Sequence, residues 1–382
     1  METRKIYYED SHCREFEAEV VSCEEGKNGF QVVLDATAFY PEGGGQACDL
    51  GTLGDARVRD VRERDGVPVH LCDRALPVGS RVTGKIDWAR RLDLMQQHTG
   101  EHIVSGILHK MFGCHNVGFH MGAETVTIDF DVWIPQEALA QAEEEANRAV
   151  YENLPVRCWY PEEEALSSLP YRTKKQLPWP VRIVEVPGYD MCACCGVHVK
   201  RTGEIGLIKL LSCVKFHEGV RIEMLCGARA FKFLSEVYEQ NRQVSQAFSA
   251  KILETGGAAR RMNDALAEEK FRSIGMQKQL FDFIAEDCRQ KNESLYFGEG
   301  LQPTQVRELA DRIARICGQG AVLSGDDTKG YQVCLAGDVA QAGKALTQTL
   351  GGRGGGKPGF FQGSIPATRE QILHFFENWG KE

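Results

Sequence analysis

Two pairs of residues that lie far apart in the sequence have the types and the spacing of metal ligands. His98 and His102 are four residues apart in a segment predicted to be helical, so both imidazoles would project from one helix face, one turn apart. Cys194 and His198 have the same spacing. Three imidazole nitrogens and one thiolate are a suitable ligand set for Zn²⁺. The two pairs predict a zinc site whose ion keeps a net positive charge and can polarise an ester carbonyl or acidify a bound water.

Two neighbouring cysteines offer an alternative to this ligand set. Cys192 and Cys195 are separated by two residues, which is the spacing of a redox or metal-binding pair. We prefer Cys194 because its distance in sequence to His198 matches the spacing of the helical histidine pair.

The histidine pair also fits a second zinc motif. His98-Thr-Gly-Glu-His102 follows His-x-x-Glu-His, the inverted zinc-peptidase pattern, in which Glu101 would be the base. A peptidase would need a further acidic ligand and a peptide cleft, and it would leave Cys194 and His198 unexplained. Glu101 is therefore either a candidate general base or a helix residue that points to solvent.

A run of three glycines is the next candidate for function. Gly43, Gly44 and Gly45 precede Gln46, and such a run lets backbone amides approach a ligand closely. The alternative is a tight hairpin turn.

The overall charge and composition limit the classes of function. The 382 residues are 42% hydrophobic and 26% charged, as expected for a globular protein, and a net charge of −9 argues against indiscriminate nucleic-acid binding. A local basic path is still available. Three basic groups could form one: Arg90 with Arg91, Arg172 with Lys174 and Lys175, and Lys200 with Arg201.

The sequence predicts a cytoplasmic protein. It has no apolar run of about 18 residues and no secretory signal, so we expect no membrane association. The 14 cysteines are scattered apart from the cluster at 192–195, and we expect most of them to be small buried residues of a protein in a reducing compartment.

The pattern of strands and helices predicts an α+β multidomain chain. Residues 1–85 alternate with period two in short segments, as in a small N-terminal β-barrel. Residues 86–227 predict an α/β two-layer domain, with a first helix over 88–112 capped by Asp87. Residues 228–293 predict a helical hairpin, broken at Thr255-Gly256-Gly257, that would be a spacer or a dimer contact. Residues 294–382 alternate helix and strand and predict a C-terminal α/β domain.

Together these motifs resemble the AlaX family, the free-standing alanyl-tRNA editing proteins related to the editing half of alanyl-tRNA synthetase. The resemblance spans roughly residues 30–230 and depends on FYPEGGGQACDLG, DWARRLDLMQQHTGEH, GFHMG with TIDFD, CCGVHVKRTGEIGLIKL and GVRIEMLCG. It implies that the domain at 86–227 is a zinc-dependent editing domain.

The C-terminal glycine run is similar to one in the last domain of the synthetase. GGRGGGKPGFFQG matches the glycine loop that engages tRNA in that family, which makes the chain similar to the long AlaX form. Gly351 to Lys357 also satisfies Gly-x4-Gly-Lys, but Pro358 replaces the Ser or Thr of a nucleotide P-loop. The loop has no histidine, so binding is expected there rather than catalysis; a plain surface loop is the alternative. Nothing resembles an aminoacylation core, so the resemblance implies editing in trans.

The resemblance implies hydrolysis of the ester that joins a wrongly attached serine to alanine tRNA, with glycine as a second candidate for removal. The zinc ligands would be His98, His102, Cys194 and His198. Thr37 matches a family threonine thought to recognise the serine hydroxyl, Gln46 is a second polar candidate, and Glu101 is the candidate base. Candidate contacts to the tRNA or its aminoacyl end are Gly43, Gly44, Gly45, Arg90, Arg91, Lys200, Arg201, Arg353 and Lys357. Rival functions are a zinc peptidase and a non-catalytic tRNA-binding protein with a structural zinc, and a homodimer is a further expectation.

Overall fold

The computed structural model describes residues 3–173 and 179–379 and divides into two compact units, Met1–Gln243 and Val244–Glu382. Lys174 and Lys175, which belong to one of the predicted basic groups, lie outside the described residues. In the described part of the chain no helix has both the length and the apolar character needed to cross a bilayer.

The first unit begins with six strands that close into a barrel. In chain order they are β2 (Glu15–Gly26), β3 (Gly29–Leu34), β5 (Gly51–Leu53), β6 (Ala56–Arg64), β7 (Val67–Cys72) and β8 (Arg81–Ile86), and their order around the barrel is β2-β3-β7-β6-β5-β8. Alternate residues of β2, among them Phe16, Ala18 and Val20, are buried in its core, as the period-two pattern requires. Two short elements precede β2, namely β1 (Arg4–Lys5) and α1 (Ile6–Glu9), and the short β4 (Ala36–Thr37) lies between β3 and β5 in the chain. Strand β1 pairs in parallel with β4.

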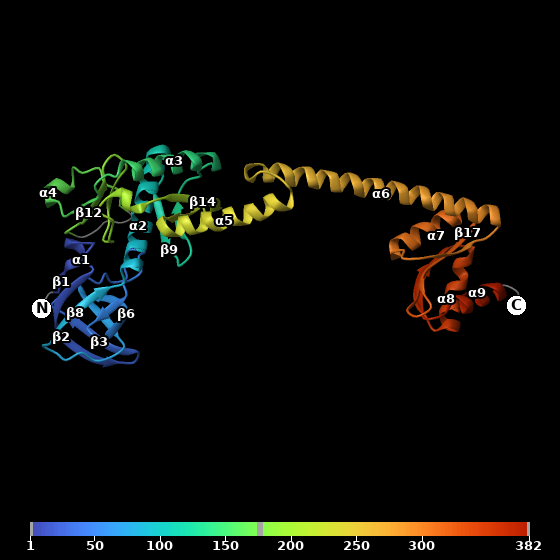
Figure 1. The fold of residues 1–382 in the computed structure, drawn as a ribbon, viewed down its shortest axis with the longest axis horizontal. Helices are drawn as coiled ribbons and strands as arrows, with labels where there is room; N and C mark the ends of the chain where they lie inside the picture. The colour runs from blue at the N-terminus through green and yellow to red at the C-terminus, as the bar shows by residue number, and fades with distance from the viewer. Residues whose placement is uncertain (1–2, 174–178, 380–382) are drawn as a thin grey trace. The chain divides into compact units, whose positions relative to one another are not determined.

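Helix α2 (Trp88–Phe112) follows the barrel directly and is the central helix of the unit (Figure 1). Asp87 caps it by accepting a hydrogen bond from the backbone N–H of Arg90, and Gly113 ends it with a φ of 65°. Most of the helix from Leu94 to Leu108 is buried, so its side chains face neighbours on several sides.

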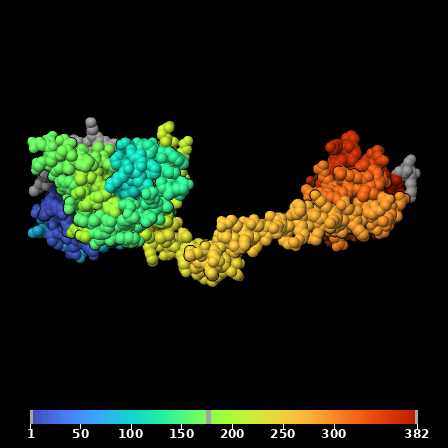
Figure 2. Space-filling view, turned by 90° about the horizontal axis from the view of Figure 1, so that it is seen from above, coloured from blue at the N-terminus to red at the C-terminus, as the bar shows by residue number. Residues whose placement is uncertain are grey.

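Two antiparallel sheets surround α2. The larger has the order β14-β15-β10-β9 and consists of β9 (Asn116–Met121), β10 (Val126–Phe130), β14 (Ile208–Phe216) and β15 (Gly219–Cys226). The smaller consists of β11 (Arg157–Trp159), β12 (Ile183–Val186) and β13 (Asp190–Ala193), and β13 leads into Cys194. Helices α3 (Gln136–Glu152) and α4 (Glu163–Leu166) and the 3₁₀ turn η1 (Thr202–Ile205) complete this part. In the space-filling view, the barrel (blue) and the segments after it (cyan to green) form one packed body (Figure 2).

The second unit contains a five-stranded sheet with helices. Helix α5 (Gly227–Ala247) runs up to it, followed by η2 (Ile252–Glu254) and the long α6 (Thr255–Lys291). The sheet has the order β16-β17-β18-β20-β19, with β16 (Leu295–Gly298), β17 (Gln319–Asp326), β18 (Gly330–Gly337), β19 (Arg353–Lys357) and β20 (Phe360–Ile365). The remaining elements are α7 (Pro303–Cys317), η3 (Asp338–Gln341), α8 (Ala342–Leu350) and α9 (Arg369–Asn378).

The prediction of a mixed α and β chain with several sheets is confirmed, whereas the four domain boundaries stay predictions. Two local predictions are wrong. The helical segment breaks at residues 248–254, and Thr255, Gly256 and Gly257 instead form the first turn of α6. The C-terminal glycine run is not a loop, because Arg353–Lys357 pairs with β20 as an edge strand. Extended backbone with small residues fits an edge strand, since only one side must be hydrogen-bonded.

Candidate metal centre and cavity

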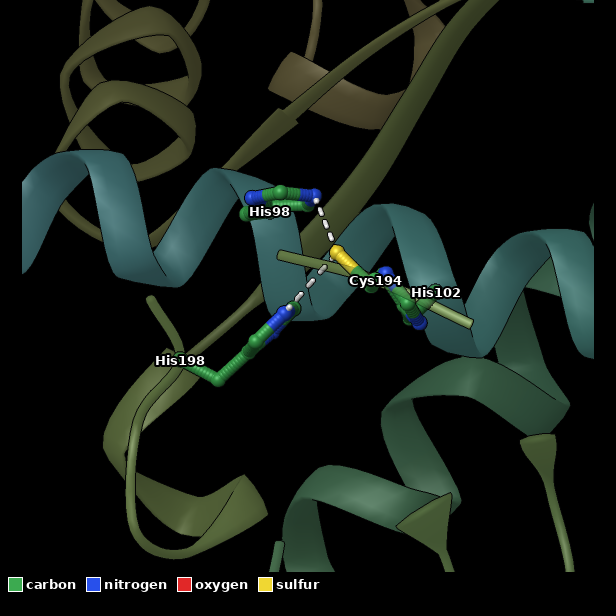
Figure 3. Close-up of side chains that lie close together, drawn as sticks. All are labelled: His98, His102, Cys194 and His198. Carbon is green, nitrogen blue, oxygen red and sulfur yellow. Dashed lines mark hydrogen bonds between the residues drawn. The ribbon is translucent and has the colours of Figure 1, made fainter. Parts of the chain in front are cut away.

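The structure brings the two predicted ligand pairs together. His98 and His102 project from one face of α2, and Cys194 and His198 reach them from the segment after β13 (Figure 3). Candidate ligand atoms of all four side chains lie within 4.8 Å of one another. His98, His102 and His198 are buried and Cys194 is half-buried, so the group lies largely in the interior.

The distances between these atoms suit a tetrahedral zinc ion. The Cys194 Sγ lies 3.5 Å from the Nε2 of His98 and 3.6 Å from the Nε2 of His198. Two ligands of one tetrahedral ion, at a Zn–S distance of about 2.3 Å and a Zn–N distance of about 2.0 Å, are about 3.5 Å apart. The residues present therefore fit the ion that the sequence predicts.

Each histidine is oriented by a partner on its other ring nitrogen. The Nδ1 of His98 is 2.7 Å from the Oε1 of Gln46, and the Nδ1 of His102 is 3.0 Å from the Oδ2 of Asp190. The Nδ1 of His198 is 3.1 Å from the Oγ1 of Thr99. Partners of this kind fix the ring and leave Nε2 as the ligand atom, which is the usual arrangement around zinc.

The pKa of Cys194 differs in direction from those of the neighbouring cysteines 192 and 195. Burial alone would raise the pKa of Cys194, but the charges of His98 and His102 and the hydrogen bonds from His102 and His198 hold it well below its ordinary value. Burial also lowers the pKa of His198 to about 3, with His98 adding to this effect, so the His198 ring is neutral. The Cys194 thiolate and the neutral His198 ring are the protonation states in which these two residues bind a metal. For His102, burial lowers the pKa, but the charge of Cys194 and the hydrogen bond to Asp190 outweigh it and raise the pKa well above its ordinary value, so a bound cation would displace a proton from this ring.

The competing cysteine pair has the opposite character. Burial raises the pKa of Cys192 to about 11, and burial followed by the charge of Cys194 raises that of Cys195. Both side chains are therefore neutral thiols. Cys192 does lie near His102 and Asp190, close enough for the three to form a second candidate ligand group. Because Asp190 already holds the outer nitrogen of His102, we take Cys194 as the ligand.

A cavity of about 250 Å³ opens beside the four side chains. Besides His98, His102 and Cys194, its walls contain residues of α2, β9, β13, the glycine turn and two further segments outside these elements: Gly44, Glu101, Asn116, Phe119, Arg172, Thr173, Cys192, Ala193 and Cys195. A larger hollow of about 710 Å³ shares Asn116, Arg172, Thr173 and Cys192 with it. The smaller cavity has the size for an amino acid rather than for a folded chain.

The glycine run is both a tight turn and a wall of this cavity. Gly43 and Gln46 exchange two backbone hydrogen bonds, and Gly44 and Gly45 have φ values of 60° and 83° between them. Those angles belong to a two-residue hairpin turn that glycine forms without strain. A Cβ on Gly45 would lie 2.6 Å from the ring of Phe119, which stacks on His98. The turn thus brings its backbone close to the ligand histidine.

Glu101 does not point to solvent. It is buried, and its Oε1 accepts hydrogen bonds from the Oγ of Ser105, at 2.6 Å, and from the Nδ2 of Asn116. Asn116, Asp190 and Arg172 are the site residues that sequence reasoning missed or placed elsewhere. Arg172 donates from Nε to the Oδ1 of Asp190 over 2.7 Å, so it supports the partner of His102 instead of forming part of a surface path.

Two other predicted site residues lie elsewhere. The hydroxyl of Thr37 is 2.8 Å from the Nε2 of His70 and accepts from the N–H of Phe39; it is fully buried in the barrel and does not line the cavity. The prediction of Arg91 as a tRNA contact is wrong, because its side chain is buried and paired with Asp49. An arginine held this way ties α2 to the barrel and cannot reach a phosphate.

The other predicted tRNA contacts remain accessible to different degrees. Arg90 is half-buried and donates to the backbone carbonyl of Cys48 over 3.1 Å. Lys200 and Arg201 are exposed, although Lys200 lies 2.7 Å from Asp10. Arg353 and Lys357, both exposed, are four residues apart in the edge strand β19 and therefore share one face of it.

Three family models match the chain. The model of the threonyl and alanyl tRNA synthetase second additional domain matches residues 181–223, which include Cys194 and His198. The model of the class II (A) tRNA synthetases matches residues 3–90, which include the barrel strands, and the DHHA1 domain model matches residues 291–382.

Among curated proteins, similar sequences are alanine–tRNA ligases. The ligase of Thermofilum pendens is 33% identical over 393 residues, which cover 96% of this chain and 43% of the ligase. The ligase of Ignicoccus hospitalis is 37% identical over 65% of this chain and 28% of the ligase, and that of Pyrococcus abyssi is 30% identical over 95% and 42%. The chain thus spans less than half the length of these relatives.

Proposed function

Because this chain belongs with the relatives of alanyl-tRNA synthetase, we propose that it hydrolyses alanine tRNA that carries the wrong amino acid. The substrate is tRNA(Ala) charged with serine, and also with glycine. The resemblance to the free-standing editing proteins supports action in trans on a tRNA charged by another protein.

One observation carries this proposal: four metal-competent side chains meet beside a cavity that has room for one amino acid. The cavity of about 250 Å³ excludes a folded substrate but admits the aminoacyl end of a flexible tRNA terminus. An ester at that end is already activated, so a polarised carbonyl and a positioned water are sufficient for its hydrolysis.

In the proposed reaction, water adds to the ester carbonyl carbon and the bond from that carbon to the ribose oxygen breaks. The ribose oxygen takes up a proton, and the free amino acid and a tRNA with a free hydroxyl leave. A zinc ion bound by His98, His102, Cys194 and His198 would have no free tetrahedral position, so it would supply a Lewis acid for the carbonyl only by accepting a fifth ligand or releasing one of the four, and would otherwise shape the site.

The protein's own residues position the reactants. Gln46, Asp190 and Thr99 hold the three imidazoles in the orientation that presents Nε2. Glu101 lines the cavity, and among the described residues only its Oε1 is hydrogen-bonded, which leaves Oε2 to accept a proton from the attacking water.

Selection of serine over alanine needs a polar group that is satisfied only by a hydroxyl. The Nε2 of Gln46 is buried and has no hydrogen-bond partner in the described part of the chain. An unpaired buried donor costs about 1–3 kcal/mol, and a serine hydroxyl in reach of it would recover that energy whereas alanine would not. Gln46, like Thr37, is not part of the cavity wall, but its Oε1 contacts the candidate ligand His98, whereas the Thr37 hydroxyl is already paired with His70. We therefore propose Gln46, in place of Thr37, for recognition of the serine hydroxyl.

The tRNA itself is the proposed partner. Lys200 and Arg201 lie on the segment that follows His198, and Arg353 and Lys357 lie on β19. Their exposed cations suit phosphate oxygens. A zinc peptidase is less well supported, because Cys194 and His198 complete the ligand group and Asp190 contacts the outer nitrogen of His102.

The test incubates the purified full chain, loaded with zinc, with seryl-, glycyl- and alanyl-tRNA(Ala) and with an unfolded peptide. We expect release of serine and glycine, little release of alanine, and no cleavage of the peptide. Zinc binding without release of any amino acid would favour a non-catalytic tRNA-binding protein, and cleavage of the peptide alone would favour the peptidase.

A further inference from the structure

Asn116 is a buried polar residue that the proposed reaction does not yet use. It begins β9, its side chain is 6% exposed, and it lines the cavity beside the four candidate ligands. Its Oδ1 is buried and has no hydrogen-bond partner in the described part of the chain. A buried acceptor without a donor destabilises the protein by about as much free energy as a hydrogen bond contributes. Such an atom therefore indicates a position where a ligand could supply the missing donor.

The orientation of the Asn116 amide is fixed by its neighbours. Its Nδ2 donates to the Oε1 of Glu101 and, over 3.3 Å, to the Oγ of Ser105. A carboxylate oxygen can only accept, so the amide nitrogen must face Glu101 and the amide oxygen must face away from it. The unpaired Oδ1 is therefore held in place before any ligand binds.

The charges around Asn116 favour a cationic donor. Glu101 contributes a carboxylate to the cavity wall, and Arg172, which also lines the cavity, donates to the carboxylate of Asp190 and is close enough to Glu101 for their charges to interact. An amide oxygen next to a carboxylate is a suitable receptor for a primary ammonium group, which brings three N–H donors and one positive charge.

We propose that the Oδ1 of Asn116, with the carboxylate of Glu101 beside it, binds the α-ammonium group of the aminoacyl end. This inference deepens the proposed function and depends on it for the identity of the ligand. The ammonium is carried by the carbon next to the ester carbonyl, so a cavity that holds the amine also places the carbonyl near the four candidate ligands. Asn116 is then a binding residue common to serine and glycine, whereas Gln46 recognises the hydroxyl.

The test measures Kd values of non-hydrolysable analogues for the zinc-loaded full chain. The analogues are adenosine with serine attached at the 3′ position through an amide, and the same compound without the α-amino group. A charge-assisted hydrogen bond predicts that the analogue lacking the amine binds roughly 10- to 100-fold more weakly. Equal affinities would overturn the inference without any mutation, so it remains testable even if a variant fails to fold.

The variant Asn116→Ala should lose most of the preference for the amine-bearing analogue, because only the Glu101 carboxylate then remains beside the amine. The control Ser105→Ala removes only one neighbour of the amide and should keep the preference for the amine. If Asn116→Ala retains the full preference, the proposed contact is absent.

Seryl- and glycyl-tRNA distinguish the inference from the proposed reaction. Asn116→Ala should slow release of both amino acids by a similar factor, since both carry the ammonium. A loss confined to serine would mean that Asn116 recognises the hydroxyl and would overturn the inference. If the wild-type chain binds the amine-bearing analogue more tightly but hydrolyses neither tRNA, the proposed reaction fails and the ammonium site stands.

Discussion

At the scale of single residues, the ligand atoms were predictable and their surroundings were not. Spacing alone paired His98 with His102 and Cys194 with His198, because one helical turn or one tight loop forces such neighbours together. The structure adds the reason for choosing Cys194 over Cys192, namely that the charges around it favour a thiolate.

The residues that were missed have partners remote in sequence. Asn116 and Asp190 stand alone in the sequence, and nothing there shows that they meet Glu101 and His102. The prediction of Arg91 as a tRNA contact is wrong because its partner, too, is remote in sequence. A buried arginine that pairs with Asp49, 42 residues away, has the same sequence signature as a surface arginine next to Arg90.

His70 provides a prediction about stability. It is fully buried in the barrel, where its Nδ1 is 3.1 Å from the carbonyl of Val32 and its Nε2 accepts from Thr37, and burial lowers its pKa from 6.5 to about 4. In the unfolded chain the His70 ring is protonated below about pH 6.5, whereas in the folded chain it stays neutral down to about pH 4. The contribution of His70 is thus fully present above pH 6.5 and is lost as the pH falls towards 4, by at most about 3.5 kcal/mol at about 1.4 kcal/mol per pKa unit.

The measurement compares the free energy of unfolding of the wild type and of His70→Gln across that pH range. Glutamine can also donate to Val32 and accept from Thr37, but it does not titrate. The stability difference between the two proteins should shrink as the pH falls, since all other titrations are common to both. A difference that is constant with pH would show that His70 is not buried as a neutral ring.

At the scale of elements, local signals succeeded where the chain makes local contacts. Asp87 was expected to cap a helix, and it accepts from the N–H of Arg90 at the start of α2. The glycine run at 353–357 was misjudged because glycine is usual in loops, whereas here it pairs with β20, a partner that spacing does not reveal. The first glycine run, by contrast, meets both expectations, since Gly44 lies in a tight turn and also in the cavity wall.

At the scale of the whole molecule, the second unit carries a separate prediction. The match to the DHHA1 domain covers residues 291–382, and β19 presents Arg353 and Lys357 on one exposed face. We expect deletion of residues 294–382 to weaken binding of tRNA(Ala) strongly while leaving the rate of hydrolysis at saturating tRNA nearly unchanged, because the cavity and the ligands lie in the first unit. Binding titrations and single-turnover rates measure the two effects, and unchanged affinity after deletion would remove this role.

The central claim is that one cation is held by two pairs of residues from distant parts of the chain. The most direct measurement is the zinc content of the wild type and of two matched variants, Cys194→Ala and Cys192→Ala, after dialysis against a weak chelator. We predict about one zinc per chain for the wild type and for Cys192→Ala, and loss of the ion from Cys194→Ala with the fold retained. Among the cysteines that the structure describes, only Cys194 has its sulfur at ligand distance from both His98 and His198. Full zinc content in Cys194→Ala would contradict the account.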